Sequence, residues 1–215
     1  MSTPTIECVR GVYPLADDDP GWSHSPRSLV RAALSAGASI VQVRLKHTGD
    51  GEALQMLEWA ARSAREREAL LIVNDRYDLA DLAGAGGVHL GQDDLPPESI
   101  PSEVRTRLVV GLSTHTLAQV RESRDRPVDY IAFGPVFGTA SKETRYVARG
   151  VEALANAVAL AGRPVVAIGG VTLENVGAIR RAGVHAFAVI SAVAATSDPE
   201  KAIRLLGEKF ESGEG

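Results

Sequence analysis

The sequence consists of short apolar, β-branched segments that alternate with longer amphipathic segments. This alternation is typical of repeated βα units and of a parallel sheet. We predict eight strands, over residues 6–15, 39–44, 69–74, 87–91, 107–112, 128–134, 164–169 and 184–190. We predict eight helices, over residues 26–36, 51–67, 78–83, 97–104, 117–123, 151–161, 173–182 and 199–210.

The number and order of these segments indicate one fold. Eight consecutive βα units in 215 residues, without a linker or a low-complexity tract, predict a single (β/α)8 barrel over residues 1–215. The alternative, an open doubly wound sheet, would have a Gly-x-Gly-x-x-Gly turn after the first strand, where Gly11 stands alone. In a barrel the active site forms where the strands end, so the residues after each strand are the candidates.

Composition narrows the possible partners. There are 23 Lys and Arg against 27 Asp and Glu with no basic run, so we expect no nucleic-acid or anionic-membrane surface. The single cysteine, Cys8, excludes an intrachain disulfide and a multi-thiolate metal site. The first ten residues do not resemble a secretory signal, and no uncharged apolar run approaches about 18 residues. We therefore expect a cytoplasmic protein, as a monomer or a homo-oligomer.

Three polar residues share one face of the second predicted strand. The strand period of two places Gln42, Arg44 and Lys46 opposite the apolar side chains between them. If those apolar side chains pack against helices, the polar row points into the barrel mouth, where unpaired cations are costly to desolvate. Two interpretations stay open: the row binds an anion, or it pairs with carboxylates on neighbouring strands.

Carboxylates follow the third and fourth predicted strands. Asn74 and Asp75 end the third strand, and Asp93 and Asp94 follow the fourth, so we expect them at one edge of the mouth. Mg²⁺ prefers oxygen ligands and is typically held by one or two carboxylates together with substrate phosphate oxygens. Helix capping or turn formation explains any single aspartate better, but two of them beside two cations favour a metal site.

Hydroxyl groups, an imidazole and a long loop follow the fifth and sixth predicted strands. Ser113 and His115 end the fifth strand, and no carboxylate that would orient His115 is evident nearby, so we interpret His115 as a turn or packing residue. His89, inside a strand, is interpreted as a hydrogen-bonded core residue.

A long loop over residues 138–150 follows the sixth predicted strand. It suits a lid over a phosphate, with plain solvent exposure as the alternative for its second half. The side chains that suit a phosphate there are Thr139, Ser141 and Lys142.

Small residues follow the seventh and eighth predicted strands. Gly169 and Gly170 precede a predicted helix start and leave backbone N–H groups unshielded, and Ser191 follows the eighth strand. The corresponding loops of (β/α)8 barrels often bind phosphate. Tight strand-to-helix packing is the other explanation for the glycine pair.

The predicted mouth as a whole indicates a type of reaction. No activated nucleophile or acid–base pair is evident in the sequence, and there are two phosphate-binding regions. These features favour a reaction driven by stabilisation of a departing phosphate group.

Eight short motifs occur in order along the chain, at residues 42–46 (Gln-Val-Arg-Leu-Lys), 74–76 (Asn-Asp-Arg), 89–95 (His-Leu-Gly-Gln-Asp-Asp-Leu), 111–113 (Gly-Leu-Ser), 134–137 (Gly-Pro-Val-Phe), 139–142 (Thr-Ala-Ser-Lys), 167–170 (Ala-Ile-Gly-Gly) and 190–191 (Ile-Ser). In their joint order and spacing they resemble the thiamine phosphate synthase family. The resemblance implies a magnesium-dependent barrel transferase. Such an enzyme joins 4-amino-5-hydroxymethyl-2-methylpyrimidine diphosphate to 4-methyl-5-(2-hydroxyethyl)thiazole phosphate and releases diphosphate.

The resemblance also implies roles for particular residues. Mg²⁺ would be held by Asp75 and Asp94. The pyrimidine diphosphate would be bound by Gln42, Arg44, Lys46, Asn74, Ser113 and Lys142. The thiazole phosphate would be bound by Thr139, Ser141, Gly170, Ile190 and Ser191. The residues expected to act in catalysis are Arg44, Lys46, Ser113 and Lys142.

Two positions depart from the family pattern, and two related functions stay open. Ser141 stands where the family usually has threonine, which keeps the hydroxyl, and residues 11–17 lack the usual Thr-Asp ending. The alternatives are a thiazole tautomerase-like paralogue, in which His115 would have a role, and a non-catalytic phosphate-binding regulator. Such paralogues commonly lack the Asn-Asp and Gln-Asp-Asp elements, which are intact at residues 74–75 and 92–94 and favour the synthase.

Overall fold

A computed structural model of the chain describes residues 5–138 and 146–213. Within these residues, eight parallel strands form a closed barrel in which each strand pairs with its neighbours in sequence and β8 pairs with β1. The strands are β1 (Gly11–Asp17), β2 (Ile40–Arg44), β3 (Leu70–Asn74), β4 (Gly87–Leu90), β5 (Val109–Thr114), β6 (Tyr130–Phe133), β7 (Val165–Ile168) and β8 (Ala186–Val189). The predicted (β/α)8 fold is confirmed.

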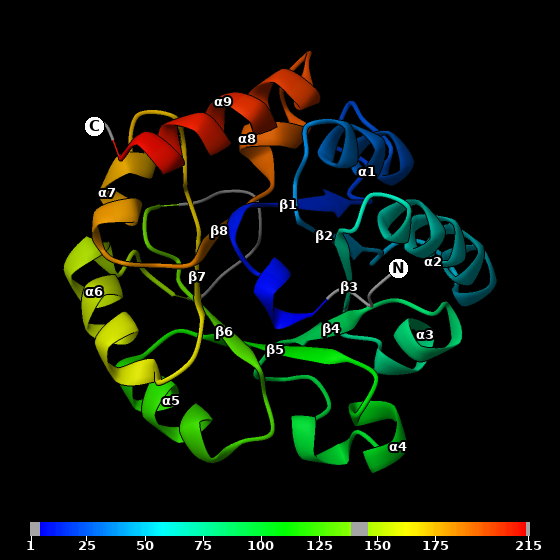
Figure 1. Ribbon diagram of the computed structural model, residues 1–215, viewed down its shortest axis with the longest axis horizontal. Helices are drawn as coiled ribbons and strands as arrows, with labels where there is room; N and C mark the ends of the chain where they lie inside the picture. Colours follow the sequence, from blue (N-terminus) through cyan, green and yellow to red (C-terminus); the bar gives the residue numbers. More distant parts are fainter. Residues whose placement is uncertain (1–4, 139–145, 214–215) are drawn as a thin grey trace.

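Helices surround the barrel on its outside (Figure 1). They are α1 (Pro26–Ser35), α2 (Asp50–Arg65), α3 (Tyr77–Leu82), α4 (Ser102–Arg105), α5 (Leu117–Glu122), α6 (Gly150–Ala161), α7 (Val176–Arg181), α8 (Ser191–Ala194) and α9 (Pro199–Ser212). Short 3₁₀ turns are η1 (Ile6–Cys8), η2 (Pro97–Ser99) and η3 (Ser123–Asp125). Among the described residues, no helix is long and apolar enough to cross a membrane.

Alternation along the strands divides the apolar side chains between two cores. Val41 and Val43 belong to an outer core between strands and helices, whereas Ile40 and Ile72 belong to an inner core inside the barrel. A parallel sheet that is covered on both faces in this way has strands that are apolar almost throughout. Gln42 alternates with the valines and therefore points into the interior, as the sequence predicted.

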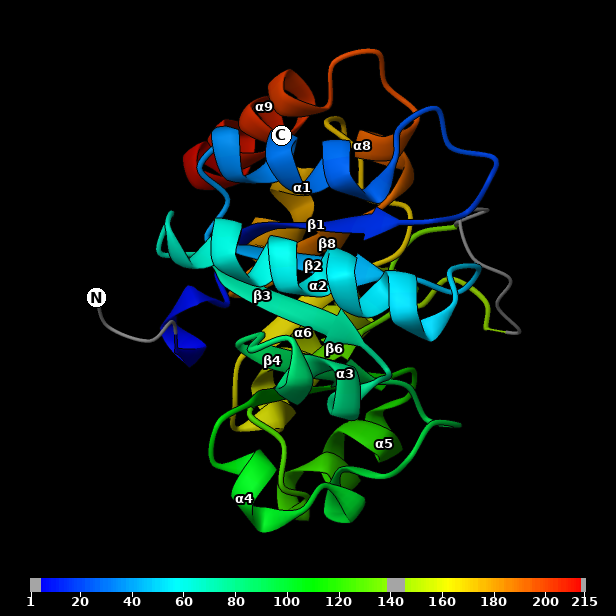
Figure 2. The same cartoon turned by 90° about the vertical axis from the view of Figure 1, so that its right-hand side faces the viewer.

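The amino-terminal segment is a turn, so the prediction of a strand over residues 6–15 was wrong in its first half. Ile6–Cys8 form η1, and β1 begins only at Gly11, whose φ is +66°. Val9 packs on the inner core. The segment therefore shields the apolar interior from water at the amino-terminal end of the barrel, opposite to the carboxyl ends of the strands (Figure 2).

Two predicted helices are shorter than expected, for local reasons. Residues 97–104 are divided into η2 and α4 because Pro101 keeps Ile100 extended, with a ψ of 122°. The helix predicted over 173–182 begins only at Val176. Before it, the Asn175 side chain accepts a hydrogen bond from the Thr172 N–H (2.8 Å) and donates one to the Gly170 carbonyl (2.9 Å), so these residues form a turn.

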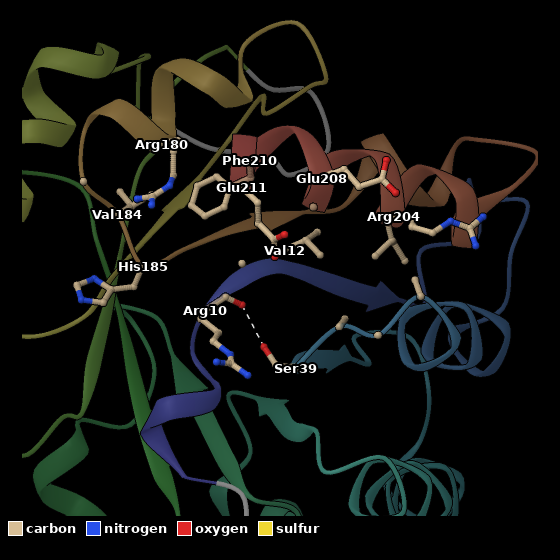
Figure 3. Close-up of a pocket in the computed structure, with 17 residues that line it drawn as sticks. Arg10, Val12, Ser39, Arg180, Val184, His185, Arg204, Glu208, Phe210 and Glu211 are labelled. Atoms are coloured by element: carbon tan, nitrogen blue, oxygen red, sulfur yellow. Dashed lines mark hydrogen bonds between the residues drawn. The ribbon is translucent and has the colours of Figure 1, made fainter. Parts of the chain in front are cut away.

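A groove of about 810 Å³ lies at the amino-terminal end of the barrel, beside α9 and the start of β1 (Figure 3). Val12 and Phe210 line it together with Arg180, whose guanidinium lies 5.5 Å from the centre of the Phe210 ring. Ser39 Oγ donates a hydrogen bond to the Arg10 carbonyl at 3.1 Å. Residues at this end of a (β/α)8 barrel serve stability, and active sites form at the opposite end, so the groove is not the candidate site.

Replacement of Leu70 by alanine tests the inner core. Leu70 is fully buried, so we expect Leu70→Ala to lower the free energy of unfolding by about 3 kcal/mol through lost burial and the cavity left behind. Leu82→Ala is the control, because Leu82 is 68% exposed and its truncation should change stability by less than about 0.5 kcal/mol. Chemical denaturation measures both; equal effects would contradict the assignment of Leu70 to a packed interior.

Candidate active site

The two cations of the β2 row lie at the barrel mouth, and each meets a carboxylate. Arg44 Nη1 lies 2.6 Å from Asp17 Oδ2, at the end of β1. The Lys46 ammonium pairs with Asp75, directly after β3. The interpretation as ion pairs with neighbouring strands is therefore confirmed for both cations. Both also lie where an anion entering the mouth would meet them.

Asp17 is a site residue that the sequence reasoning missed. Its side chain is 3% exposed, whereas that of Arg44 is 20% exposed. Besides Arg44, it accepts hydrogen bonds from Trp22 Nε1 (3.1 Å) and from the Asp19 N–H (2.9 Å). A guanidinium paired with a buried, multiply bonded carboxylate is held in one position, so Asp17 fixes the Arg44 side chain.

Asp18, also missed, organises the loop that carries Lys46. Its carboxylate accepts hydrogen bonds from the N–H groups of Lys46 (2.7 Å), His47 (2.9 Å) and Thr48 (2.9 Å), and from the Thr48 hydroxyl (2.8 Å). Burial acts to raise the pKa of Asp18, but these hydrogen bonds together outweigh burial and hold the pKa below its ordinary value. The available signal was the run of three aspartates at residues 17–19, next to a cationic strand.

Asp75 directly follows β3 and Asp94 lies in the turn after β4, so both carboxyl groups are at the same edge of the mouth. The Asp94 carboxyl group lies close enough to that of Asp75 to change its pKa. Burial, and after it the contact with Asp94, raises the pKa of Asp75, against the opposing effect of Lys46. Lys46 therefore does not fully offset the effects of burial and of Asp94 on the ionised Asp75 carboxylate, and a bound cation would stabilise that carboxylate further.

Backbone geometry brings these two carboxylates together. Asp75 has a φ of +63°, a conformation uncommon for a residue with a side chain, and its N–H donates to the His89 carbonyl at 2.8 Å. Asp94 accepts a hydrogen bond from the Gly91 N–H at 2.7 Å, and a Cβ at Gly91 would lie 2.8 Å from the carboxylate. Asp94 therefore shapes its turn. Asp75 does not cap a helix, because α3 has Arg76 at its N-cap position and no side-chain cap.

Ser113, Gln42 and Asn74 occupy the inner face of their strands near the mouth. Ser113 Oγ on β5 lies 2.9 Å from Nε2 of His89 on β4. His89 is buried, so the interpretation as a hydrogen-bonded core residue is confirmed. Asn74 is two residues beyond Ile72 of the inner core and therefore shares its face of β3.

A cavity of about 110 Å³ lies on the other side of the mouth, where β5 to β8 end. It is lined by residues that include Ser113, His115, Gly169, Gly170, Ile190 and Ser191. Gly169 and Gly170 have φ values of +100° and +64°, and a Cβ on either would overlap the segment after β6, at Pro135 or Phe137. The two glycines are therefore explained by tight packing, as one of the two interpretations expected. They pack against the segment after β6, however, and not against a helix.

His115 lies in this cavity and is anchored by several contacts. Its Nδ1 donates to the Gly134 carbonyl at 2.7 Å, and its backbone N–H donates to Gln119 Oε1 at 2.7 Å. Its ring stacks on Tyr146, with the ring centres 3.9 Å apart. These contacts agree with the interpretation as a turn and packing residue. Three other candidates, Thr139, Ser141 and Lys142, lie outside the described residues, as does much of the predicted lid.

The ends of the strands of this closed barrel carry cations, carboxylates and a small-residue cavity, which is the place where (β/α)8-barrel enzymes form their active sites. A family model described as thiamine monophosphate synthase matches residues 12–193, which is most of the chain. The chain belongs to the thiamine monophosphate synthase family, and the family resemblance of the sequence motifs is confirmed.

Individual relatives agree with this assignment. The chain is 44% identical over 191 residues to the thiamine-phosphate synthase of Synechococcus sp. strain WH7803, covering 87% of this chain and 54% of that protein. It thus spans about half the length of that relative. It is 42% identical over 188 residues to the thiamine-phosphate synthase of Anaeromyxobacter dehalogenans, covering 87% and 84%. The solved thiamine phosphate pyrophosphorylase of Pyrococcus furiosus superimposes with a TM-score of 0.87 at 32% identity, covering 98% of this chain and 100% of that chain.

Replacement of Asp18 by asparagine tests its role in the Lys46 loop. Asparagine cannot accept the full set of hydrogen bonds, so we expect Asp18→Asn to lower the free energy of unfolding at pH 7 by about 1–2 kcal/mol. Because the folded pKa lies below the unfolded value, the carboxylate contributes fully above about pH 4, and its contribution is lost as the pH falls further. The difference between the two proteins should therefore shrink below about pH 4.

Asp19→Asn is the matched control for this experiment. Asp19 is exposed, and its Oδ1 accepts a single hydrogen bond, from the Gly21 N–H, which an asparagine oxygen can also accept. Denaturation curves at several pH values compare the variants. A stability loss in Asp18→Asn that is the same at every pH would contradict the role given to the charge.

Proposed function

We propose that the chain is a thiamine phosphate synthase, a transferase that forms thiamine phosphate and diphosphate from 4-amino-5-hydroxymethyl-2-methylpyrimidine diphosphate and 4-methyl-5-(2-hydroxyethyl)thiazole phosphate. The observation that carries the proposal is the placement of Asp75, which pairs with Lys46, close to Asp94 at the ends of β3 and β4, in a chain of this family. The two separate regions of the mouth suit two phosphorylated substrates. A charged region follows β1 to β4, and a small-residue region follows β7 and β8.

The residues present fit a magnesium ion. Among the described residues, no group of three or more histidine, cysteine, aspartate or glutamate side chains could hold a metal by itself. Mg²⁺ does not need such a cage, because one or two carboxylates and substrate phosphate oxygens typically hold it. Asp75 and Asp94 supply two carboxylates whose mutual repulsion a cation relieves. We therefore propose Mg²⁺ as the cofactor and these two aspartates as its ligands.

The chain's own residues act mainly on the leaving diphosphate. Arg44 is fixed by Asp17 and Lys46 by its anchored loop, so both are positioned before the substrate arrives. They donate hydrogen bonds to diphosphate oxygens, and Lys142 is proposed as a third cation there. Mg²⁺, when bound, adds positive charge that stabilises the same leaving group.

The bonding changes balance without a protein nucleophile. The bond between the pyrimidine methylene carbon and the diphosphate oxygen breaks, and its electron pair leaves with diphosphate. The thiazole nitrogen then supplies the electron pair of the new carbon–nitrogen bond. Gln42, Asn74 and Ser113 are proposed to orient the pyrimidine, and the residues proposed to hold the thiazole phosphate are Thr139, Ser141, Gly170, Ile190 and Ser191.

A coupled assay tests the proposal. Purified protein is incubated with both substrates and Mg²⁺, and thiamine phosphate is quantified by chromatography, with EDTA in a parallel reaction. We expect product only when the metal is available. Folded protein that forms no product with Mg²⁺ would contradict the proposal. Binding of the thiazole phosphate without turnover would then favour the regulator, and its isomerisation the tautomerase-like paralogue.

Replacement of Asp75 by asparagine separates activity from stability. We expect Asp75→Asn to lower kcat by about 100-fold or more, because one carboxylate of the proposed metal site is lost. The pKa of Asp75 is raised in the folded protein, so its ionised form opposes folding at neutral pH. Asparagine removes that charge and tolerates a positive φ, so the free energy of unfolding at pH 7 should stay equal or rise.

The pH dependence of this difference and a nearby control complete the test. The gain in stability should disappear as the pH falls through the folded pKa of Asp75, where the wild-type carboxyl becomes neutral. Asp78→Asn is the control, because Asp78 lies on α3 and pairs with Arg76 on the surface. It should keep the wild-type kcat. A clear loss of stability in Asp75→Asn, or full activity, would contradict the role proposed for this aspartate.

A further inference from the structure

A continuous row of buried hydrogen bonds crosses the interior of the barrel below the mouth. Gln42 Nε2 donates to the Tyr13 hydroxyl at 2.8 Å, and the Tyr13 and Tyr130 hydroxyl oxygens lie 3.1 Å apart. The Tyr130 hydroxyl lies 3.0 Å from His89 Nδ1, and His89 Nε2 lies 2.9 Å from Ser113 Oγ. We call these five residues the interior relay. It joins Gln42 on β2 to Ser113 on β5.

Four of the five residues of the interior relay are buried, and Ser113, at its end, is partly buried and lines the cavity at the mouth. Tyr13, Gln42, His89 and Tyr130 are each at most 8% exposed. Burial raises the pKa of both tyrosines, so both hydroxyls keep their protons at neutral pH. Polar groups at this depth require hydrogen-bond partners, and each of these side chains has one within the relay.

Gly111 gives the interior relay its path across β5. The register pairs His89 of β4 with Gly111 and Gly111 with Tyr130 of β6, so the bond from His89 to Tyr130 passes over the glycine. A Cβ at residue 111 would overlap the Tyr130 ring and collide with His89 Nδ1. A glycine in the middle of β5 is thus explained, because the hydrogen bond between His89 and Tyr130 occupies the space that a side chain at residue 111 would need.

The donor and acceptor capacities of the groups give the interior relay a direction. Gln42 Nε2 can only donate, so the Tyr13 oxygen accepts and the Tyr13 hydroxyl hydrogen goes to Tyr130. Tyr130 then donates to His89 Nδ1. A neutral imidazole that accepts at Nδ1 carries its hydrogen on Nε2, so His89 donates to Ser113. The hydroxyl hydrogen of Ser113 is therefore directed away from the relay.

We propose that Tyr13, Tyr130 and His89 are positioning residues that hold Ser113 as a hydrogen-bond donor toward the pyrimidine substrate. This inference rests on the proposed function, which assigns Gln42 and Ser113 to that substrate. The pyrimidine ring nitrogens accept hydrogen bonds, so a serine already fixed as a donor meets an acceptor without reorientation. To reverse the direction of these hydrogen bonds, the Gln42 amide would have to rotate and His89 would have to change its tautomer. The donor and acceptor roles of the five residues therefore depend on one another.

Nuclear magnetic resonance of the substrate-free protein tests the direction. Long-range proton–nitrogen spectra of ¹⁵N-histidine-labelled protein, with the His89 signals assigned through His89→Gln, should show the hydrogen on Nε2 and an accepting Nδ1. Tyr130→Phe removes the donor to Nδ1 and should shift that nitrogen resonance. Thr114→Val is the matched control, because it removes a buried hydroxyl on the same strand that donates to the Ala132 carbonyl (2.9 Å), outside the relay.

The outcomes that would overturn the proposal are specific. One is a His89 that carries its hydrogen on Nδ1 or is doubly protonated at neutral pH. Another is an Nδ1 resonance that Tyr130→Phe leaves in place, or that Thr114→Val shifts equally. These spectra need no substrate. Absence of thiamine phosphate in the coupled assay would therefore overturn the proposed function without deciding the direction of the relay.

Steady-state kinetics test whether the interior relay acts as a unit. Tyr13→Phe and Tyr130→Phe should each raise KM for the pyrimidine diphosphate about fivefold to tenfold and leave KM for the thiazole phosphate unchanged. The double variant should lose no more than either single variant, because one break already interrupts the relay. Additive losses, or equal changes for both substrates and in Thr114→Val, would overturn the proposal. If Tyr130→Phe does not fold, Tyr13→Phe carries the same comparison.

Discussion

The electrostatic interaction between Asp75 and Asp94 is the one on which the proposed metal site at the mouth of this barrel depends. Two carboxylates held together repel each other, and burial adds to the unfavourable free energy of the ionised pair. The positive φ of Asp75 and the close approach of Asp94 to Gly91 keep the pair assembled. An unfavourable backbone conformation such as the positive φ of Asp75 persists only where the surrounding structure holds it in place. Here the closed sheet and its two apolar cores do so.

The other charged residues of the mouth lie beside this pair of carboxyl groups. Asp17 and Asp18 fix the two cations of β2, one through its guanidinium and the other through its loop. The region after β7 and β8 has small residues instead of charges, and its glycines are required by positive φ values and by the adjacent segment after β6. The interior relay lies beneath both regions, so the barrel interior is a polar support for the site as well as an apolar core.

Much of this could be predicted from the sequence because it depends on periodicity. Strand alternation placed Gln42, Arg44 and Lys46 on the inner face, and the rule that parallel strands end at one rim brought Asp75 and Asp94 together. The two strand-end aspartates of β1 were missed because the sequence does not show which carboxylate meets which cation; the register Asp17 to Arg44 decides that. The interior relay was missed for the same reason, since only the register aligns His89, Gly111 and Tyr130.

Anomalous diffraction from crystals that contain Mn²⁺ and the pyrimidine diphosphate tests the proposed metal site at Asp75 and Asp94 most directly. Mn²⁺ replaces Mg²⁺ at oxygen sites and can be located independently of the protein atoms. We expect an anomalous peak at metal–ligand distance, about 2.1 Å, from carboxylate oxygens of Asp75 and Asp94. A bound diphosphate without metal at these two aspartates, or with the metal bound elsewhere, would contradict the proposed metal site.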